Sequence, residues 1–108
     1  MLSKVKKLVD YISSNLDRRL TLDDFAQAAK LSRSRVSYLF KAQTGSAPLQ
    51  YLKLRRMEKA RELLETTSLS IKQIRARVAM EDRSHFEREF KKAYGVTPSQ
   101  CRTNSTEL

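Results

Sequence analysis

The chain has 108 residues, with 22 Lys and Arg against 12 Asp and Glu, a formal net charge of +10 at pH 7. This length suits a single domain with a modest core and is too short for a separate sensor domain. The basic excess indicates a polyanionic partner, with nucleic acid favoured over an anionic membrane surface. The longest apolar runs are only a few residues, which excludes a membrane-spanning helix.

The chain contains one cysteine, Cys101, and one histidine, His85. A lone cysteine cannot form an internal disulfide, which suits a reducing cytoplasm. One Cys and one His provide no metal-ligand set, and the sequence offers no acid–base pair or activated nucleophile. We therefore expect no metal, no cofactor and no enzymatic activity, and we interpret Cys101 as a small buried hydrophobe.

Apolar residues recur at helical spacing almost throughout, and no strand pattern of period two is present. A first amphipathic helix is predicted over residues 5–16. Thr21 then caps a short helix, with Asp24 in the capping-box position. Ser32 caps the next helix, which ends at Gly45 because glycine adopts the left-handed conformation readily.

The second half repeats this order after a long helix predicted over residues 48–65, on which charges spaced by three and four predict intrahelical ion pairs. Ser70 and Gln73 form a second capping box ahead of another short helix. A further helix is predicted over residues 82–95, and Pro98 opens a last short helix.

Residues 32–50 and 82–100 share seven identities in nineteen aligned positions, where chance gives roughly one. The shared pairs are Arg33/Arg83, Ser34/Ser84, Phe40/Phe90, Lys41/Lys91, Gly45/Gly95, Pro48/Pro98 and Gln50/Gln100. The segments upstream of these align best at a shift of forty-nine instead of fifty. The turn of the second unit therefore carries one extra residue, near Glu81.

Each unit is thus a short helix, a tight turn and a second, basic helix, the arrangement of a helix-turn-helix that places its second helix in the major groove. The predicted fold class is all-α. We expect one helix-turn-helix lobe over residues 1–46, a linker helix over 47–66, a second lobe over 67–103 and a frayed tail over 104–108.

Three groups of residues follow a known pattern. They are Leu22, Ala26, Ser32, Phe40, Lys41 and Gly45; Tyr51, Arg56, Ala60, Leu63 and Leu64; and Phe86, Phe90, Lys91, Gly95, Thr97, Pro98, Ser99 and Arg102. In these residues the chain resembles the DNA-binding domain of AraC-type (AraC/XylS) transcription regulators, over about residues 5–103. The resemblance implies about seven helices in two lobes, joined by the long linker helix, with two recognition helices that enter successive major grooves.

The resemblance also implies a bacterial, cytoplasmic, nucleoid-associated transcription regulator, more often an activator, that binds double-stranded DNA as a monomeric domain. RNA polymerase is a candidate partner, and a longer protein that carries this domain is a candidate dimer. We favour the interpretation that the chain is a fragment of such a protein. The alternative function is that of a non-specific nucleoid-type DNA- or RNA-binding protein, which leaves the paired recognition helices unexplained. A membrane-surface role is not expected.

The chain departs from the family pattern at three places. The family usually has a small residue at the position of Arg75, a Gly-Phe pair at 79–80 and an aromatic residue at Cys101. The position of Arg75 packs between the two helices of the motif. Either the stem of Arg75 extends outward along the surface, or the second lobe packs differently.

On the first recognition helix, Val36, Leu39 and Phe40 are predicted to face inward. The candidate DNA-binding residues are Arg33, Ser34, Arg35, Ser37, Tyr38 and Lys41. Residues 30–41 hold four basic residues and no acid, whereas an ordinary solvated helix face mixes charge signs. The short serines favour sparse or water-mediated base contacts, with phosphate anchoring as the main role of this helix.

On the second recognition helix, the candidates are Arg83, Ser84, His85 and Arg88. Arg83 and Arg88 have the length and the fork geometry to read O6 and N7 of guanine. Glu87 either accepts from cytosine N4 or, as we favour, pairs with an arginine of its own helix. His85 either contacts DNA or is an uninvolved surface histidine.

Further basic side chains, those of Lys72, Arg75 and Arg77, are candidates for clamping phosphates because residues 66–80 contain no acid. We expect most of the base reading on the second recognition helix.

Overall fold

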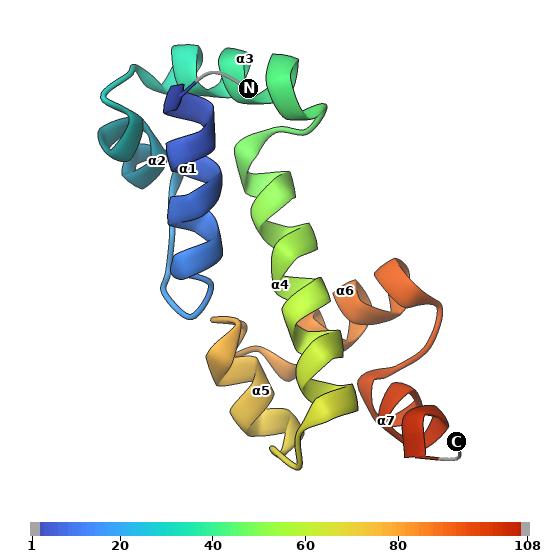
Figure 1. Ribbon diagram of the computed structural model, residues 1–108. Coiled ribbons are helices and arrows are strands. Elements are labelled where there is room, and N and C mark those ends of the chain that lie inside the picture. The colour runs from blue at the N-terminus through green and yellow to red at the C-terminus, as the bar shows by residue number, and fades with distance from the viewer. Residues whose placement is uncertain (1–2, 107–108) are drawn as a thin grey trace. The chain divides into compact units, whose positions relative to one another are not determined.

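The computed structural model describes residues 3–106, which form seven α-helices and no strand. In chain order the helices are α1 (Ser3–Ser14), α2 (Leu22–Ala29), α3 (Arg33–Thr44), α4 (Pro48–Thr66), α5 (Ile71–Arg77), α6 (Arg83–Tyr94) and α7 (Pro98–Thr106) (Figure 1). The all-α prediction is confirmed. None of the described helices is both long enough and apolar enough to cross a bilayer.

The chain divides into two compact units, residues 1–53 and 54–108, and α4 runs across the boundary. Each unit has its own hydrophobic core. The long helix that we expected to link the two lobes contributes to both cores, with Leu52 in the first and Met57, Ala60, Leu63 and Leu64 in the second. The two halves of α4 are therefore structural parts of the units they belong to.

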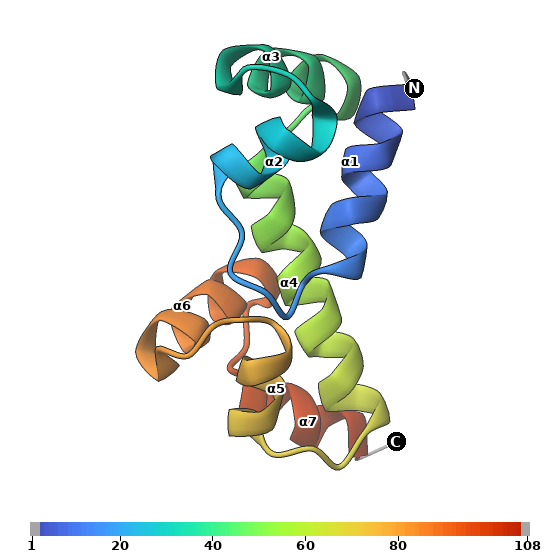
Figure 2. The same cartoon turned by 90° about the vertical axis from the view of Figure 1, so that its left-hand side faces the viewer.

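In the first unit, α1, α2 and α3 pack against one another (Figures 1 and 2). Phe25 of α2 and Phe40 of α3 are fully buried in its core. The ring of Phe40 also meets that of Tyr51, from the first turn of α4, edge-on, with the centroids 5.2 Å apart. The recognition helix of this unit is thus held by its inward face.

The first helix ends at Ser14, earlier than the predicted residue 16. The side-chain amide of Asn15 donates to the Tyr11 carbonyl at 2.7 Å, which is the acceptor that the backbone amide of Asn15 would use in a continued helix. That backbone amide turns instead to the Ile12 carbonyl at 3.1 Å. Leu16 is buried as the periodicity predicts, but it enters the core from a turn.

In the second unit, α5, α6 and α7 gather around the C-terminal part of α4 (Figures 1 and 2). Phe86 and Phe90 of α6 are fully buried. The ring centroids of Phe90 and Tyr94 lie 5.0 Å apart. The guanidinium of Arg61 lies 4.9 Å from the centre of the Tyr94 ring. The last helix continues to Thr106, whereas we expected a frayed tail from residue 104; residues 107–108 lie outside the described part.

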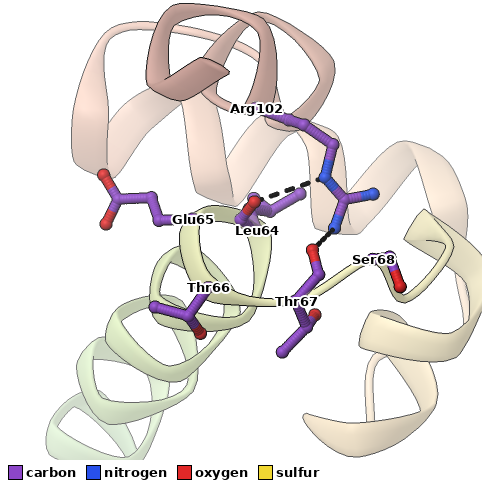
Figure 3. A pocket seen from close by; sticks show the side chains of 6 residues that line it. All are labelled: Leu64, Glu65, Thr66, Thr67, Ser68 and Arg102. Atoms are coloured by element: carbon purple, nitrogen blue, oxygen red, sulfur yellow. Dashed lines mark hydrogen bonds between the residues drawn. The ribbon is translucent and has the colours of Figure 1, made fainter. Parts of the chain in front are cut away.

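Arg102 of α7 closes the C-terminal end of α4 (Figure 3). Its Nε donates to the Leu64 carbonyl at 3.3 Å and its Nη2 to the Thr67 carbonyl at 3.1 Å. The last carbonyls of a helix have no partner within the helix and form the negative end of its dipole. A cation with two well-placed donors therefore satisfies them and fastens α7 to α4.

The sequence repeat is also a repeat of local structure. Residues 33–44 and 83–94 show the same succession of exposed, half-buried and buried positions. Ser32 accepts a hydrogen bond from the backbone amide of Arg35, and Asp82 accepts one from His85. The hydrogen bond from the backbone amide of His85 lowers the pKa of Asp82, whose carboxylate lies at the positive end of α6.

Both recognition helices end at a glycine in the left-handed region, with φ of 85° at Gly45 and 78° at Gly95, which confirms the prediction for Gly45. A β-carbon built on either glycine meets no atom within 4 Å. The requirement for glycine at these positions is therefore one of backbone conformation and not of space.

Replacing Gly95 by alanine is expected to lower the free energy of unfolding by about 1–2 kcal/mol, the cost of holding a β-carbon in the left-handed conformation. Gly95→Asn should cost less, because asparagine tolerates that conformation better. Urea unfolding of the two variants and the wild type measures the difference. Equal losses for alanine and asparagine would contradict this explanation.

The turns between the two helices of each unit differ by one residue, as the sequence predicts. Lys30 and Ala79 have positive φ, 56° and 53°, and are forty-nine residues apart. The caps that follow, Ser32 and Asp82, are fifty residues apart. The additional residue therefore lies between Ala79 and Asp82, which confirms its position near Glu81.

Arg75 holds this longer turn together. Its Nη1 donates to the carbonyl of Glu81, and its own carbonyl accepts from the backbone amide of Met80 at 2.9 Å. Ala26 is the equivalent residue in the first unit, where the turn is shorter. Both alternatives describe part of the structure: the half-buried Arg75 reaches an exposed carbonyl with a terminal nitrogen, and this lobe differs from the first at its turn.

Because Arg75 and the extra residue belong together, Arg75→Ala should destabilise the protein by about 1–2 kcal/mol through the lost hydrogen bond from a charged group. Deleting Glu81 from the Arg75→Ala variant recreates the combination of the first unit and should restore part of that stability. Chemical unfolding of both variants provides the measurement. A double variant that is less stable than Arg75→Ala alone would refute the coupling.

Candidate nucleic-acid interface

The outer face of α3 collects the residues predicted for the first recognition helix. Arg33, Ser34, Arg35, Tyr38 and Lys41 are exposed, and Ser37 is half-buried. Tyr38 exposes 67% of its surface, unusual for a large aromatic residue. On the opposite face, Val36 and Phe40 are buried and Leu39 is half-buried against the core, as predicted. All six candidates are thus available to a partner on one helix.

The outer face of α6 collects the second set in the same way. Arg83, Ser84, His85 and Arg88 are exposed, while Phe86 and Phe90 point into the core. Arg83 Nε lies 3.0 Å from Glu87 Oε1, which confirms that Glu87 pairs with an arginine of its own helix. His85 Nε2 lies 3.8 Å from Glu89 Oε1, an ion pair only when the imidazole is protonated.

The first arginine of α3 also has an acidic partner. Arg33 Nε lies 3.4 Å from Asp23 Oδ1, on α2. This contact joins two helices across the turn, and Asp23 is not among the residues predicted for the interface. No local pattern reveals it, because the two residues are ten positions apart and meet only once α2 packs on α3.

Three other cations of the two faces differ from Arg33 and Arg83 in lacking an acidic partner among the described residues. Within the described residues, the charged groups of Arg35, Lys41 and Arg88 take part in no ion pair or hydrogen bond. Exposed, unpaired cations cost little to bring to a phosphate or a base edge, because no existing bond is broken. Moving any of these three side chains to a polyanion would therefore break no described ion pair.

The three basic residues of the acid-free stretch before α6 differ in their surroundings. Lys72 and Arg77 are exposed on α5. The guanidinium of Arg75, in contrast, is occupied by the Glu81 carbonyl, and its Nε is buried without a partner in the described residues. Arg75 therefore differs from Lys72 and Arg77 in having one terminal nitrogen engaged within the turn.

The remaining side chains of chemical interest are structural. Cys101 is buried, and burial raises the pKa of its thiol, which makes it a poor nucleophile. Along α4, ion pairs link Arg55 to Glu58, Lys59 to Glu62 and Arg61 to Glu65, as the spacing predicts. The described residues gather no group of three or more His, Cys, Asp or Glu side chains that could hold a metal ion.

Comparisons with known proteins agree with this geometry. A family profile described as a helix-turn-helix domain matches residues 25–104. The arabinose operon regulatory protein of Escherichia coli (strain K12) is 35% identical over 106 residues, which cover 97% of this chain and 36% of that protein. The chain thus spans about a third of the length of this curated relative.

Two solved structures are similar over nearly the whole chain. The DNA-binding domain of AdpA, a global transcriptional factor solved in complex with a target DNA, superposes with a TM-score of 0.93 at 25% identity, covering 98% of this chain and 96% of that one. A transcriptional regulator with an AraC-type DNA-binding domain from Chromobacterium violaceum gives a TM-score of 0.88 at 30% identity, covering 96% and 93%. With two helix-turn-helix motifs and these relatives, the chain belongs to the AraC-type family of helix-turn-helix transcription regulators.

Proposed function

We propose that this chain binds double-stranded DNA in a sequence-specific manner and regulates transcription, inserting α3 and α6 into successive major grooves. One observation carries the proposal: two helices of the same length and the same burial pattern each present an exposed basic face. The relative AdpA was solved with a target DNA bound to its DNA-binding domain. A helix of this exposure fits the major groove, which is about 12 Å wide.

The two faces support a division of labour. The outer face of α3 has short serines between its cations, with Arg35 and Lys41 unpaired, a composition suited to phosphate contacts. The outer face of α6 offers Arg83 and Arg88, whose planar guanidinium groups match the two acceptors of guanine. We therefore assign anchoring mainly to α3 and base reading mainly to α6.

The family supports a proposal for the wider role. We propose that the chain acts in the bacterial cytoplasm, associated with the nucleoid, as a monomeric DNA-binding domain. Activation is the favoured mode of regulation, with RNA polymerase as the protein partner. Because the chain covers 36% of the arabinose operon regulatory protein, we further propose that it is part of a longer regulator, which forms a dimer.

Selection of bound duplexes from a random library tests the function directly. We expect an enriched sequence that binds at least tenfold more tightly than its scrambled version at physiological salt, since specific sites typically exceed non-specific ones by three or more orders of magnitude. The logarithm of affinity should fall linearly with the logarithm of salt concentration, because bound phosphates release counterions. Equal binding of selected and scrambled duplexes would instead establish the non-specific nucleoid-type function.

The division of labour predicts opposite behaviour of two variants. Arg88→Ala should lower affinity for the selected duplex by about 1–3 kcal/mol and relax the preference at one base pair. Lys41→Ala should weaken the selected and scrambled duplexes alike and reduce the salt slope by about one. Mobility-shift titrations at several salt concentrations provide both quantities. A base-specific loss for Lys41→Ala, or a uniform loss for Arg88→Ala, would contradict the assignment.

A further inference from the structure

The first arginine of each recognition helix lies next to a carboxylate, with Nε as the contacting atom. The contact of Arg83 is a hydrogen bond, whereas that of Arg33 is an ion pair at 3.4 Å. Arg33 uses Nε to reach Asp23, and Arg83 uses Nε to reach Glu87. Nε carries one of the five N–H groups of a guanidinium, so both terminal nitrogens stay available. These terminal nitrogens form the fork that donates to O6 and N7 of guanine.

The two carboxylates come from different positions of the repeat. At the shift of forty-nine, Asp23 corresponds to Lys72, which cannot accept from an arginine. At the shift of fifty, Glu87 corresponds to Ser37. Each lobe thus lacks the acid that the other lobe uses and has one of its own. Both lobes therefore place a carboxylate next to the first arginine of the recognition helix, but the carboxylate comes from a different position in each lobe.

Helix stability does not explain the pair on α6. An exposed pair spaced by four contributes only about 0.3–0.5 kcal/mol. The order of the charges is also the less favourable one, with the base toward the N-terminus of the helix and the acid after it. Arg83 is the first residue of α6, where the helix dipole disfavours a positive charge. The ion pair between Arg83 and Glu87 therefore suits the orientation of an exposed arginine better than the stabilisation of α6.

We infer that Glu87 is a positioning residue that aims Arg83 at the major groove, an inference that rests on the proposed DNA-binding function. Arg83 exposes 76% of its side chain and would otherwise sample many rotamers. Glu87 exposes 42% and fixes the plane of the guanidinium through Nε. When the duplex excludes water from this face, the hydrogen bond strengthens, because the local dielectric constant falls.

The charge of Glu87 should lower the affinity for DNA, and this effect can be separated from its positioning role. Glu87 carries a negative charge toward the phosphates and weakens binding to every sequence. Removing this charge should therefore raise affinity for any duplex, whereas removing the hydrogen-bond acceptor should disturb only the reading by Arg83. Glutamine and alanine remove the same charge, but only glutamine keeps an oxygen that accepts from Nε.

The experiment measures dissociation constants of the full chain and its variants for the selected duplex and for its scrambled version. Glu87→Gln and Glu87→Ala should both bind the scrambled duplex more tightly than the wild type. The ratio of the two affinities should fall by about fivefold to a hundredfold in Glu87→Ala, the range of one bidentate base contact. Glu87→Gln should retain the ratio to within about threefold. Glu58→Gln, which removes a charge paired to Arg55 on α4, is the control and should leave the ratio unchanged.

A double-variant cycle isolates the link to the arginine. Arg83→Ala alone should lower the ratio, and adding Glu87→Ala to it should lower it no further. The inference is overturned if Glu87→Ala keeps the wild-type ratio, if its loss persists in the Arg83→Ala background, or if Arg83→Ala has no effect on the ratio. In each of these outcomes the proposed function stands as long as the wild type binds the selected duplex more tightly than the scrambled one.

A wild type that binds the two duplexes equally overturns the proposed function together with the inference. Unfolding midpoints of all variants should agree closely, because the pair is exposed.

Discussion

A helix that offers one face to DNA can be held only by the opposite face, and the rest of this structure depends on that constraint. In each recognition helix the fully buried part of the inward face is a pair spaced by four residues, Val36 with Phe40 and Phe86 with Phe90, all at most 2% exposed. Full burial of such a side chain contributes about 1.5–3 kcal/mol. Two anchors of this size hold a helix of 12 residues, so the ends of each helix must be fixed as well. The caps and the left-handed glycines do this at both ends.

The features predicted correctly from the sequence are those with local causes. Capping boxes at Thr21 and Ser70, the glycine stops and the inward stripe follow from a few neighbouring residues, and the structure shows all of them. The intrahelical pairs of α4 and the extra residue near Glu81 are of the same kind. Each of them is set by spacing along the chain, which a reading of the sequence captures directly.

The features that the sequence did not reveal depend on contacts between segments or on competing hydrogen bonds. The end of α1 depends on which donor of Asn15 bonds to the Tyr11 carbonyl. The side-chain amide takes this acceptor, and the backbone amide bonds to the Ile12 carbonyl instead. The helical turn beyond residue 103 carries no apolar periodicity that predicts it. Asp23 and the partner of Arg75 emerge only after two helices pack or a turn closes. The candidate DNA-binding residues all lie where the periodicity places them, and their contacts with DNA stay predictions.

The bond from Arg102 to the end of α4 has a consequence for how the second unit is made. It joins residues 35 and 38 positions apart and closes a loop that contains α5 and α6. Closing a loop of this length has an entropic cost that must be met before the contact stabilises the unit. The helix assigned to base reading thus lies inside a closure completed by the last helix of the chain. During synthesis the second unit therefore completes its packing only after residue 102 has emerged from the ribosome.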